Sequence, residues 1–242
     1  MTAAPLHMAG QRLMLDPAGV CTWPAQKLLA VTDLHLEKGS HFAARGQFVP
    51  PYDTRETLER LGAVIRKWNP SRLVLMGDSF HDRHGCARLP AADCATLKRL
   101  LEGREVTWLL GNHDPEPPEG LPGTAVTELR IGAIVFRHEA DPARLPLGVV
   151  EVSGHFHPKT TMPVRGGGVT RPCFLTDGRR LMLPAFGAFT GGLDIRDPAI
   201  ARLFHRGGRA FLIGQERLYS FATGPLRGAM RAMEAEAAST TP

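Results

Sequence analysis

Cysteine is scarce in this chain of 242 residues, and its four cysteines form no Cys-x-x-Cys pair. That spacing argues against a disulfide scaffold and against a zinc site built on cysteine. Nowhere do ~18 apolar residues follow one another, as a membrane span requires. The first residues also lack the basic region and apolar core of a signal peptide. We therefore expect a cytoplasmic protein with reduced thiols and no membrane partner.

Charge is not concentrated in any one part of the chain. The 29 lysines and arginines exceed the 24 acidic residues by five, which weakly favours a polyanionic partner such as nucleic acid. Because the arginines are spread over the whole length, a solvated surface is the simpler interpretation. The length suits one domain with a full core, which we expect over residues 1–222, followed by a flexible C-terminal tail at residues 223–242.

Five short apolar runs end in side chains that can bind metal ions. The clearest is residues 108–110, which are followed by Gly111-Asn112-His113-Asp114. Because ligands of α/β proteins bind beyond the carboxyl ends of strands, we expect these polar groups to meet at one edge of a sheet. The polar residues after the other four runs are Asp33 with His35, Asp78, His138, and His155 with His157.

The order of elements predicts an α/β fold. Apolar runs at residues 27–32, 72–76 and 105–110 are typical of strands buried on both faces. Amphipathic helices are expected between them, at residues 53–69 with Asp53 as N-cap and at residues 92–102. Helices between strands, followed mainly by strands, predict two sheets packed face to face with helices outside. The other expected elements are a flexible lead at residues 1–10, a hairpin at 12–23, and strands at 125–130, 133–137, 149–153, 173–176, 180–183, 209–213 and 216–221.

Two long connections are expected near the site. Residues 36–51 are interpreted as an active-site loop with one short helical turn, and residues 184–197 as a glycine-rich and phenylalanine-rich connection that packs close to it. Lys38, Arg45 and His81 are candidate substrate contacts, although a solvated polar surface accounts for them equally well. The aromatic residues expected in the core rather than against nucleobases are Phe186, Phe189 and Phe204.

The number of candidate ligands indicates two metal ions. Histidine, aspartate and asparagine suit Mn²⁺, which we expect, with Fe or Zn²⁺ as alternatives. Seven candidates exceed what one tetrahedral site needs. A bridging carboxylate can hold two ions ~3.5–4 Å apart, and Asp78 is the candidate for that role. The seven residues are Asp33, His35, Asp78, Asn112, His138, His155 and His157.

The ordered motifs resemble the calcineurin-like metallophosphoesterase superfamily. They run Asp33-x-His35, Gly77-Asp78, Gly111-Asn112-His113-Asp114, His138 and Gly154-His155-x-His157. The resemblance implies a four-layer α/β/β/α sandwich of two mixed sheets with a dinuclear metal centre. It also implies one ion held by Asp33, His35, Asp78 and His157, and a second held by Asp78, Asn112, His138 and His155.

Residues around the motifs are similar to one bacterial subfamily, the ligase-associated DNA-damage-response phosphoesterases (PdeM-like). The matching stretches are residues 33–39, 50–55, 77–82 and 183–189. This resemblance implies a phosphodiesterase or endonuclease that acts on nucleic acid in DNA repair, beside a ligase or helicase partner.

The site predicts a mechanism for phosphodiester hydrolysis. Two cations would acidify a bridging water, and the hydroxide would attack phosphorus in line with the leaving oxygen. His113 is free to protonate that oxygen, with Asp114 expected to hold its other ring nitrogen. Two alternatives stay open: a phosphodiesterase or phosphatase for a cyclic nucleotide or nucleotide-sugar, and a scaffold that binds metal without catalysis.

Overall fold

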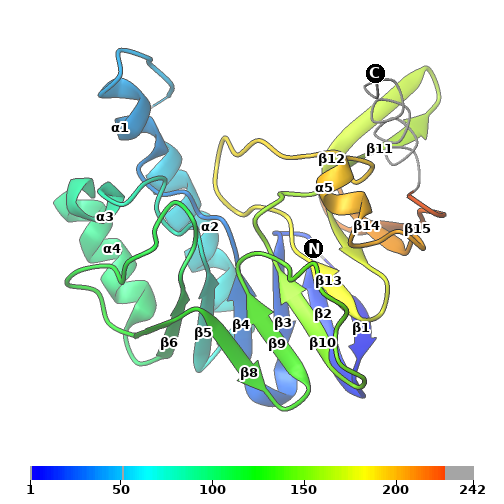
Figure 1. The fold of residues 1–242 in the computed structure, drawn as a ribbon. Helices are drawn as coiled ribbons and strands as arrows, with labels where there is room; N and C mark the ends of the chain where they lie inside the picture. Colours follow the sequence, from blue (N-terminus) through cyan, green and yellow to red (C-terminus); the bar gives the residue numbers. More distant parts are fainter. Residues whose placement is uncertain (1, 51, 227–242) are drawn as a thin grey trace, which may run out of the picture.

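The computed structural model describes residues 2–50 and 52–226 and contains two mixed sheets packed face to face (Figure 1). The strands of the first sheet, in spatial order, are β1 (Ala4–Met8), β2 (Gln11–Asp16), β3 (Val20–Trp23), β4 (Leu28–Val31), β5 (Arg72–Met76), β6 (Glu105–Leu109) and β7 (Thr124–Val126). Those of the second are β15 (Leu218–Ala222), β14 (Arg209–Ile213), β12 (Gly167–Thr176), β13 (Arg180–Met182), β10 (Val150–Ser153), β9 (Ile134–Arg137) and β8 (Glu128–Ile131), with β11 (Lys159–Val164) paired to β12.

The strands that lead to the candidate ligands run parallel. In the first sheet β4, β5, β6 and β7 are parallel neighbours, and in the second β9, β10 and β13 are. Their apolar residues alternate between two cores because successive side chains of a strand point to opposite faces. Val74 and Met76 of β5 pack between the sheets, whereas Leu73 and Leu75 face the helices.

Helices cover the two outer faces unequally. The first sheet is covered by α2 (Asp53–Trp68) and α4 (Ala91–Leu101), which bury Leu58, Leu61 and Leu97 against it. Two short helices, α1 (Lys38–Ala43) and α3 (Gly85–Arg88), stand beside them, and one turn of 3₁₀-helix precedes β4 at Pro24–Gln26. The outer face of the second sheet carries only α5 (Pro198–Ala201) among the described residues, with irregular chain around it. The expected sandwich is confirmed, with a reduced fourth layer.

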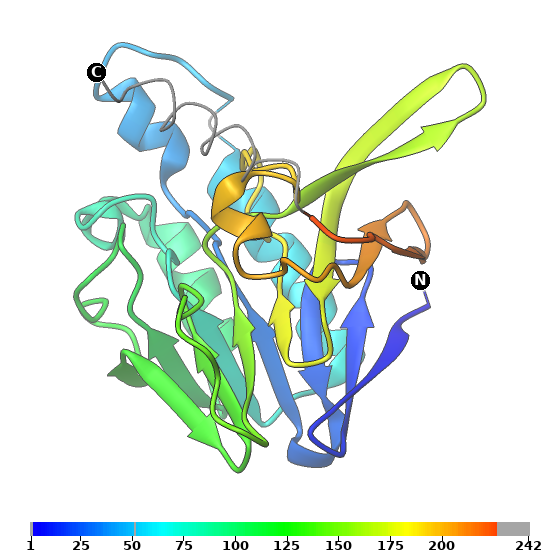
Figure 2. The same ribbon diagram turned by 45° about the vertical axis from the view of Figure 1, so that its right-hand side comes forward.

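Three sequence predictions about individual elements are wrong. Residues 4–8 form β1, the edge strand paired with β2, rather than a flexible lead. The strand expected at 125–130 is two strands, because the chain crosses from β7 in the first sheet to β8 in the second. The strand expected at 173–176 is the end of the longer β12, which forms with β11 a hairpin that projects from the second sheet (Figure 2).

The predicted cap of α2 is also wrong. Tyr52 is the N-cap residue, and its side chain makes no capping hydrogen bond. The Asp53 carboxylate instead accepts a hydrogen bond from the backbone N–H of Gly39, 3.1 Å away, in the first turn of α1. Asp53 thus ties α1 to α2, which fixes the helical turn expected inside the loop at 36–51.

The tail expected at residues 223–242 lies outside the described residues beyond 226. Within the described residues, every helix is too short or too polar to cross a membrane.

Candidate metal centre

Seven candidate ligands from both sheets meet at the carboxyl ends of five strands. Asp33 and His35 follow β4, Asp78 follows β5, and Asn112 follows β6. The second sheet supplies the others. His138 comes directly after β9, and the two histidines His155 and His157 follow β10. The parallel strands of the two packed sheets therefore bring together side chains up to 124 positions apart in the sequence.

One group of ligand atoms comes from Asp33, His35 and His157, and these atoms lie within 4.8 Å of one another. The Nε2 atom of His157 is 3.3 Å from Oδ1 of Asp33 and 3.3 Å from Nε2 of His35. Neighbouring ligands of an ion with bonds of 2.0–2.2 Å stand about 3 Å apart, so these spacings suit one shared cation. Asp78 Oδ2, 3.9 Å from His35 Nε2, stands at the border of this group.

A second group comes from Asp78, His138 and His155. The Nε2 atom of His138 lies 3.4 Å from Oδ2 of Asp78 and 3.1 Å from Nδ1 of His155. Asn112 adds its Oδ1 atom, 3.0 Å from the same nitrogen of His138. Asp78 Oδ2 therefore lies between ligand nitrogens of both groups. Asp33 Oδ1 is also 3.8 Å from His138, but from Nδ1, the nitrogen that is bonded to the Met76 carbonyl oxygen.

An unpaired oxygen shows that a cation fits the first group. The Asp33 side chain is 0% exposed, and its Oδ1 atom accepts no hydrogen bond from the residues that the structure describes, although the His157 ring is 3.3 Å away. Its other oxygen, Oδ2, accepts hydrogen bonds from the Thr32 hydroxyl and from the backbone N–H of His155. A buried polar atom without a partner is costly and rare, so Oδ1 is suited to a positive ion.

Backbone strain is concentrated at the candidate ligands. Positive φ angles occur at Asp33 (54°), His35 (44°), Asp78 (47°), His155 (70°) and His157 (48°). Residues other than glycine pay about 1–3 kcal/mol each for such conformations, which cluster at functional sites. Binding of metal ions by these side chains would compensate for the strain.

Glycines next to the ligands leave no room for a side chain. A Cβ atom at Gly111 would lie 2.2 Å from Asp78 Oδ1 and 2.3 Å from the Asp78 backbone nitrogen. At Gly77 it would lie 2.5 Å from the His138 ring, and at Gly154 it would lie 2.0 Å from the Thr32 hydroxyl. These close approaches explain why the motifs pair glycine with ligand residues.

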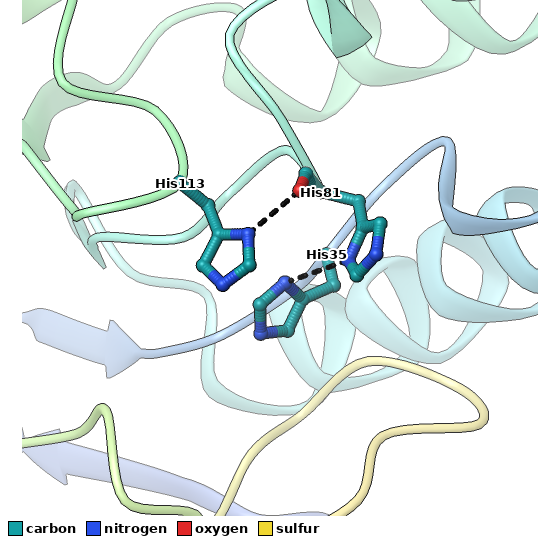
Figure 3. Close-up of side chains that lie close together, drawn as sticks. All are labelled: His35, His81 and His113. Atoms are coloured by element: carbon teal, nitrogen blue, oxygen red, sulfur yellow. Dashed lines mark hydrogen bonds between the residues drawn. The ribbon is translucent and has the colours of Figure 1, made fainter. Parts of the chain in front are cut away.

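The contact expected between His113 and Asp114 is replaced by another. The Nδ1 atom of His113 lies 2.8 Å from the backbone carbonyl oxygen of His81, to which it donates when protonated (Figure 3). Asp114 turns back toward β5, and its two oxygens accept hydrogen bonds from the backbone N–H groups of Asp78, Ser79, Phe80 and Gly111. Asp114 therefore braces the loop that carries Asp78, and the His81 carbonyl orients His113.

His81 lies beside His35 and His113 rather than on an open surface (Figure 3). Its Nδ1 atom is 3.3 Å from Nδ1 of His35, and its ring stacks on that of His113 with centroids 5.4 Å apart. A histidine that binds metal through one nitrogen commonly donates its other N–H to a neighbour. His81 is positioned to accept that bond from His35, a role that its place after Asp78 in the sequence did not reveal.

Burial and charge set the ionisation of the ligands. Burial raises the pKa of Asp33, but the imidazoles of His157, His138 and His35 outweigh it and hold the pKa below the ordinary value. Burial lowers the pKa of His35 to about 3, which keeps the ring neutral and able to bind metal. Burial also lowers the pKa of His138, but the Asp78 and Asp33 carboxylates outweigh it and raise the pKa to about 9.

The two basic candidates for substrate contact are tied to neighbouring segments. Lys38 donates from Nζ to the backbone oxygen of Phe189, 2.8 Å away. Arg45 Nη1 lies 2.7 Å from His41 Nε2, and Asp82 binds the other nitrogen of that ring. Both cations remain at the rim of the centre and do not contact a candidate ligand within the described part of the chain.

One aromatic residue departs from its expected place in the core. Phe186 and Phe204 are buried, but Phe189 is 52% exposed, with a positive φ of 57°. Its loop packs on both ligand segments, because a Cβ at Gly187 would lie 2.2 Å from the Leu34 carbonyl oxygen and one at Gly192 would lie 2.1 Å from that of His157. The hydrophobic pattern alone carried no signal of this exposure.

Comparison with known proteins agrees with this geometry. The model of the calcineurin-like phosphoesterase family matches residues 26–179, which is more than half of the chain and includes every candidate ligand. The chain belongs to this family, and it is a metal-dependent phosphoric ester hydrolase.

A solved structure with the same fold is the crystal structure of Pseudomonas putida nuclease MPE. It is 29% identical in sequence to this chain, with a TM-score of 0.70, and the match covers 91% of this chain and 100% of that one. No curated protein sequence matches the chain.

Proposed function

We propose that this protein is a nuclease that hydrolyses phosphodiester bonds of nucleic acid with two divalent metal ions, Mn²⁺ being the expected metal and Fe or Zn²⁺ the alternatives. The observation that carries the proposal is the position of Asp78 Oδ2, 3.9 Å from His35 Nε2 and 3.4 Å from His138 Nε2. One oxygen between two complete groups of ligands is suited to bridge two ions. The nuclease neighbour supports the choice of substrate.

Each ion would have four ligands from this chain. Asp33, His35, Asp78 and His157 would hold the first, and Asp78, Asn112, His138 and His155 the second. When bound, the ions would lower the pKa of a water molecule and neutralise the phosphoryl oxygens.

His113 has the position of a general acid. Its ring is 39% exposed, and its Nε2 atom is 4.0 Å from Asp78 Oδ2. His113 forms a further cluster of possible ligands with His35 and His81, but it is outside the two groups that we propose to hold metal. Because Nδ1 of His113 is bonded to the His81 carbonyl oxygen, Nε2 is the ring nitrogen that is available to a substrate. The protonated ring donates its Nε2 proton to the leaving oxygen as the ester bond breaks.

The rim of the centre suits a polyanion that carries bases. Lys38 and Arg45 supply positive charge at α1 and the loop after it, and Phe189 supplies an exposed ring next to Lys38. Aromatic rings stack on bases, and cations follow the phosphate backbone. The resemblance to ligase-associated phosphoesterases supports the finer proposal that the enzyme acts in DNA repair with a ligase or helicase partner.

The test of this function compares substrates in the presence of Mn²⁺. We expect cleavage of a generic phosphodiester and of labelled single-stranded DNA or RNA, lost on chelation and restored by Mn²⁺. Cleavage of the generic diester with intact polynucleotides would contradict the nuclease proposal and leave a small-molecule phosphodiesterase. No hydrolysis by protein shown to contain metal would contradict catalysis altogether.

Replacing Phe189 with glycine separates folding from substrate binding. Glycine relieves the cost of the positive φ, about 1–2 kcal/mol for an L-residue, so we expect the free energy of unfolding to stay unchanged or rise. Stacking on a base is worth about 1–3 kcal/mol, so the KM for a polynucleotide should rise roughly 5-fold to 150-fold. Hydrolysis of a small diester without a base should stay within about twofold.

The matched control is Tyr219→Ala, which removes a partly exposed ring from β15, four strands away from β10 in the second sheet. Steady-state kinetics and chemical denaturation of both variants provide the measurements. An unchanged KM for Phe189→Gly, or an equal rise for Tyr219→Ala, would remove Phe189 from the binding surface.

A further inference from the structure

A pocket lined by cationic side chains lies on the outer face of the second sheet. The pocket, of about 430 Å³, is lined by five arginines and one histidine from three separate segments of the chain. Arg180 belongs to the same face of β13 as Met182, which packs against α5 in the outer core. We call this site the arginine pocket; the six residues are Arg144, Arg179, Arg180, Arg202, His205 and Arg206.

Two of the arginines form a rigid wall of the pocket. Arg179 Nη2 donates to the backbone oxygens of Leu145 and Pro146, at 2.9 and 2.6 Å. Arg180 donates to the backbone oxygens of Asp141 and Ala143, both at 2.7 Å, and also binds the buried carboxylate of Glu151. These bonds hold residues 141–146 against the start of β13, so the pocket is organised before any ligand binds.

The other three arginines have no partner among residues 2–50 and 52–226. Arg144, Arg202 and Arg206 are exposed, and within these ranges the structure gives their side chains neither a hydrogen bond nor an ion pair. Other exposed arginines of the described chain, such as Arg83 and Arg165, also lack a carboxylate partner, but they do not line this cavity. Three unpaired guanidinium groups around one cavity favour an anionic ligand.

The one acidic residue of the described lining is bonded to the backbone rather than to the three unpaired guanidinium groups. Oδ1 of Asp177 accepts hydrogen bonds from the backbone N–H groups of Arg179 and Arg180, at 2.8 and 2.7 Å. Asp177 thus closes the turn between β12 and β13. Guanidinium groups bind phosphate oxygens in a planar, two-bond geometry, so phosphate is the anion that this lining suits best.

The pocket and the metal centre lie at opposite ends of the same strands. Arg180 pairs in register with Glu151 near the start of β10, and His155 follows the end of β10. A four-residue strand spans roughly 13 Å, equal to about four nucleotides of a stacked strand at 3.4 Å each. A polynucleotide is therefore long enough to touch both places at once, whereas a mononucleotide is not.

We propose that the arginine pocket is an auxiliary phosphate-binding site that holds the backbone of a nucleic acid substrate a few nucleotides from the scissile bond. This inference rests on the proposed function. The proposal predicts that substitutions in the pocket weaken the binding of long substrates and leave the chemistry at the metal centre unchanged.

The test is a triple variant, Arg144→Gln, Arg202→Gln and Arg206→Gln, which removes the three unpaired charges and retains the wall. Against a 20-nucleotide single strand, we expect KM to rise at least tenfold with kcat within about threefold. The slope of log KM against log salt should fall by about 2, since each phosphate contact of a single strand contributes about 0.7. A dinucleotide and a generic diester should be hydrolysed at the wild-type rate.

The matched control removes three arginines from the half of the molecule that contains the first sheet: Arg12→Gln, Arg66→Gln and Arg99→Gln. It has the same net charge as the test variant and should retain the wild-type KM within about threefold. Equal losses in both triple variants, an unchanged salt slope, or a parallel loss on the generic diester would overturn the pocket's role. If the wild-type protein cleaves no polynucleotide, the proposed function fails. If the wild-type protein cleaves polynucleotides and the test variant does so equally well, only the proposal for the pocket fails.

Discussion

His113→Ala should lower turnover by about 10²–10⁴-fold while both metal ions stay bound, because the variant loses only the proton donor. The Nε2 atom of His113 is 4.0 Å from Asp78 Oδ2, but neither group proposed to hold metal needs it. The loss should depend on the leaving group. A diester whose leaving group is already acidic needs little protonation, so the variant should lose much less activity on it than on DNA.

Metal analysis of the purified variant, together with kinetics on both substrates, checks this prediction. His7→Ala is the control, because His7 is exposed on β1, the edge strand of the first sheet, and belongs to neither the metal centre nor the arginine pocket. A fall in metal content that parallels the fall in turnover would make His113 a ligand. Equal losses on good and poor leaving groups would contradict its role as the acid.

Asp78→Asn should remove activity by at least about 10³-fold and should deplete both metal ions, since the bridging charge supplies several kcal/mol to the centre. The amide can keep the hydrogen bond in which the His113 backbone N–H donates to Oδ1 of residue 78, 2.9 Å away. The variant should therefore fold with the loop in place and lose the anionic bridge.

His157→Ala provides the comparison for Asp78→Asn, because His157 approaches only the first group of ligands. We expect His157→Ala to weaken the binding of one metal ion and to leave the binding of the other unchanged. Calorimetric titration with metal then distinguishes a variant with one weakened site from a variant with two. Loss of a single ion in Asp78→Asn would contradict the bridge. Asp194→Asn, a surface substitution in an ion pair with Arg196, should leave metal content unchanged.

The parallel core of the fold could be predicted from the sequence because its strands are continuous apolar runs. Residues 73–76 and 106–109 are buried on both faces, and such runs leave few alternatives. The edge strand β1 was missed because it is partly exposed and contains Pro5, which a sheet tolerates only at an edge. The crossing between β7 and β8 was missed because a single residue, Thr127, separates two strands of different sheets.

The identity of the candidate ligands followed from the motifs, but their supporting contacts did not. Asp114 is adjacent to His113 in the sequence, and the turn nevertheless directs its carboxylate to backbone amides at the end of β5. His81 meets His35 only because the loops after β4 and β5 lie side by side. Such contacts depend on loop conformation, which hydrophobic periodicity does not encode.

The central claim is that two ions share Asp78, and an anomalous difference map from crystals grown with Mn²⁺ tests it most directly. We predict two peaks: one bound by Asp33, His35 and His157, the other by Asn112, His138 and His155. Oδ2 of Asp78 should lie within bonding distance of both. A single peak, or two peaks without Asp78 between them, would contradict the account.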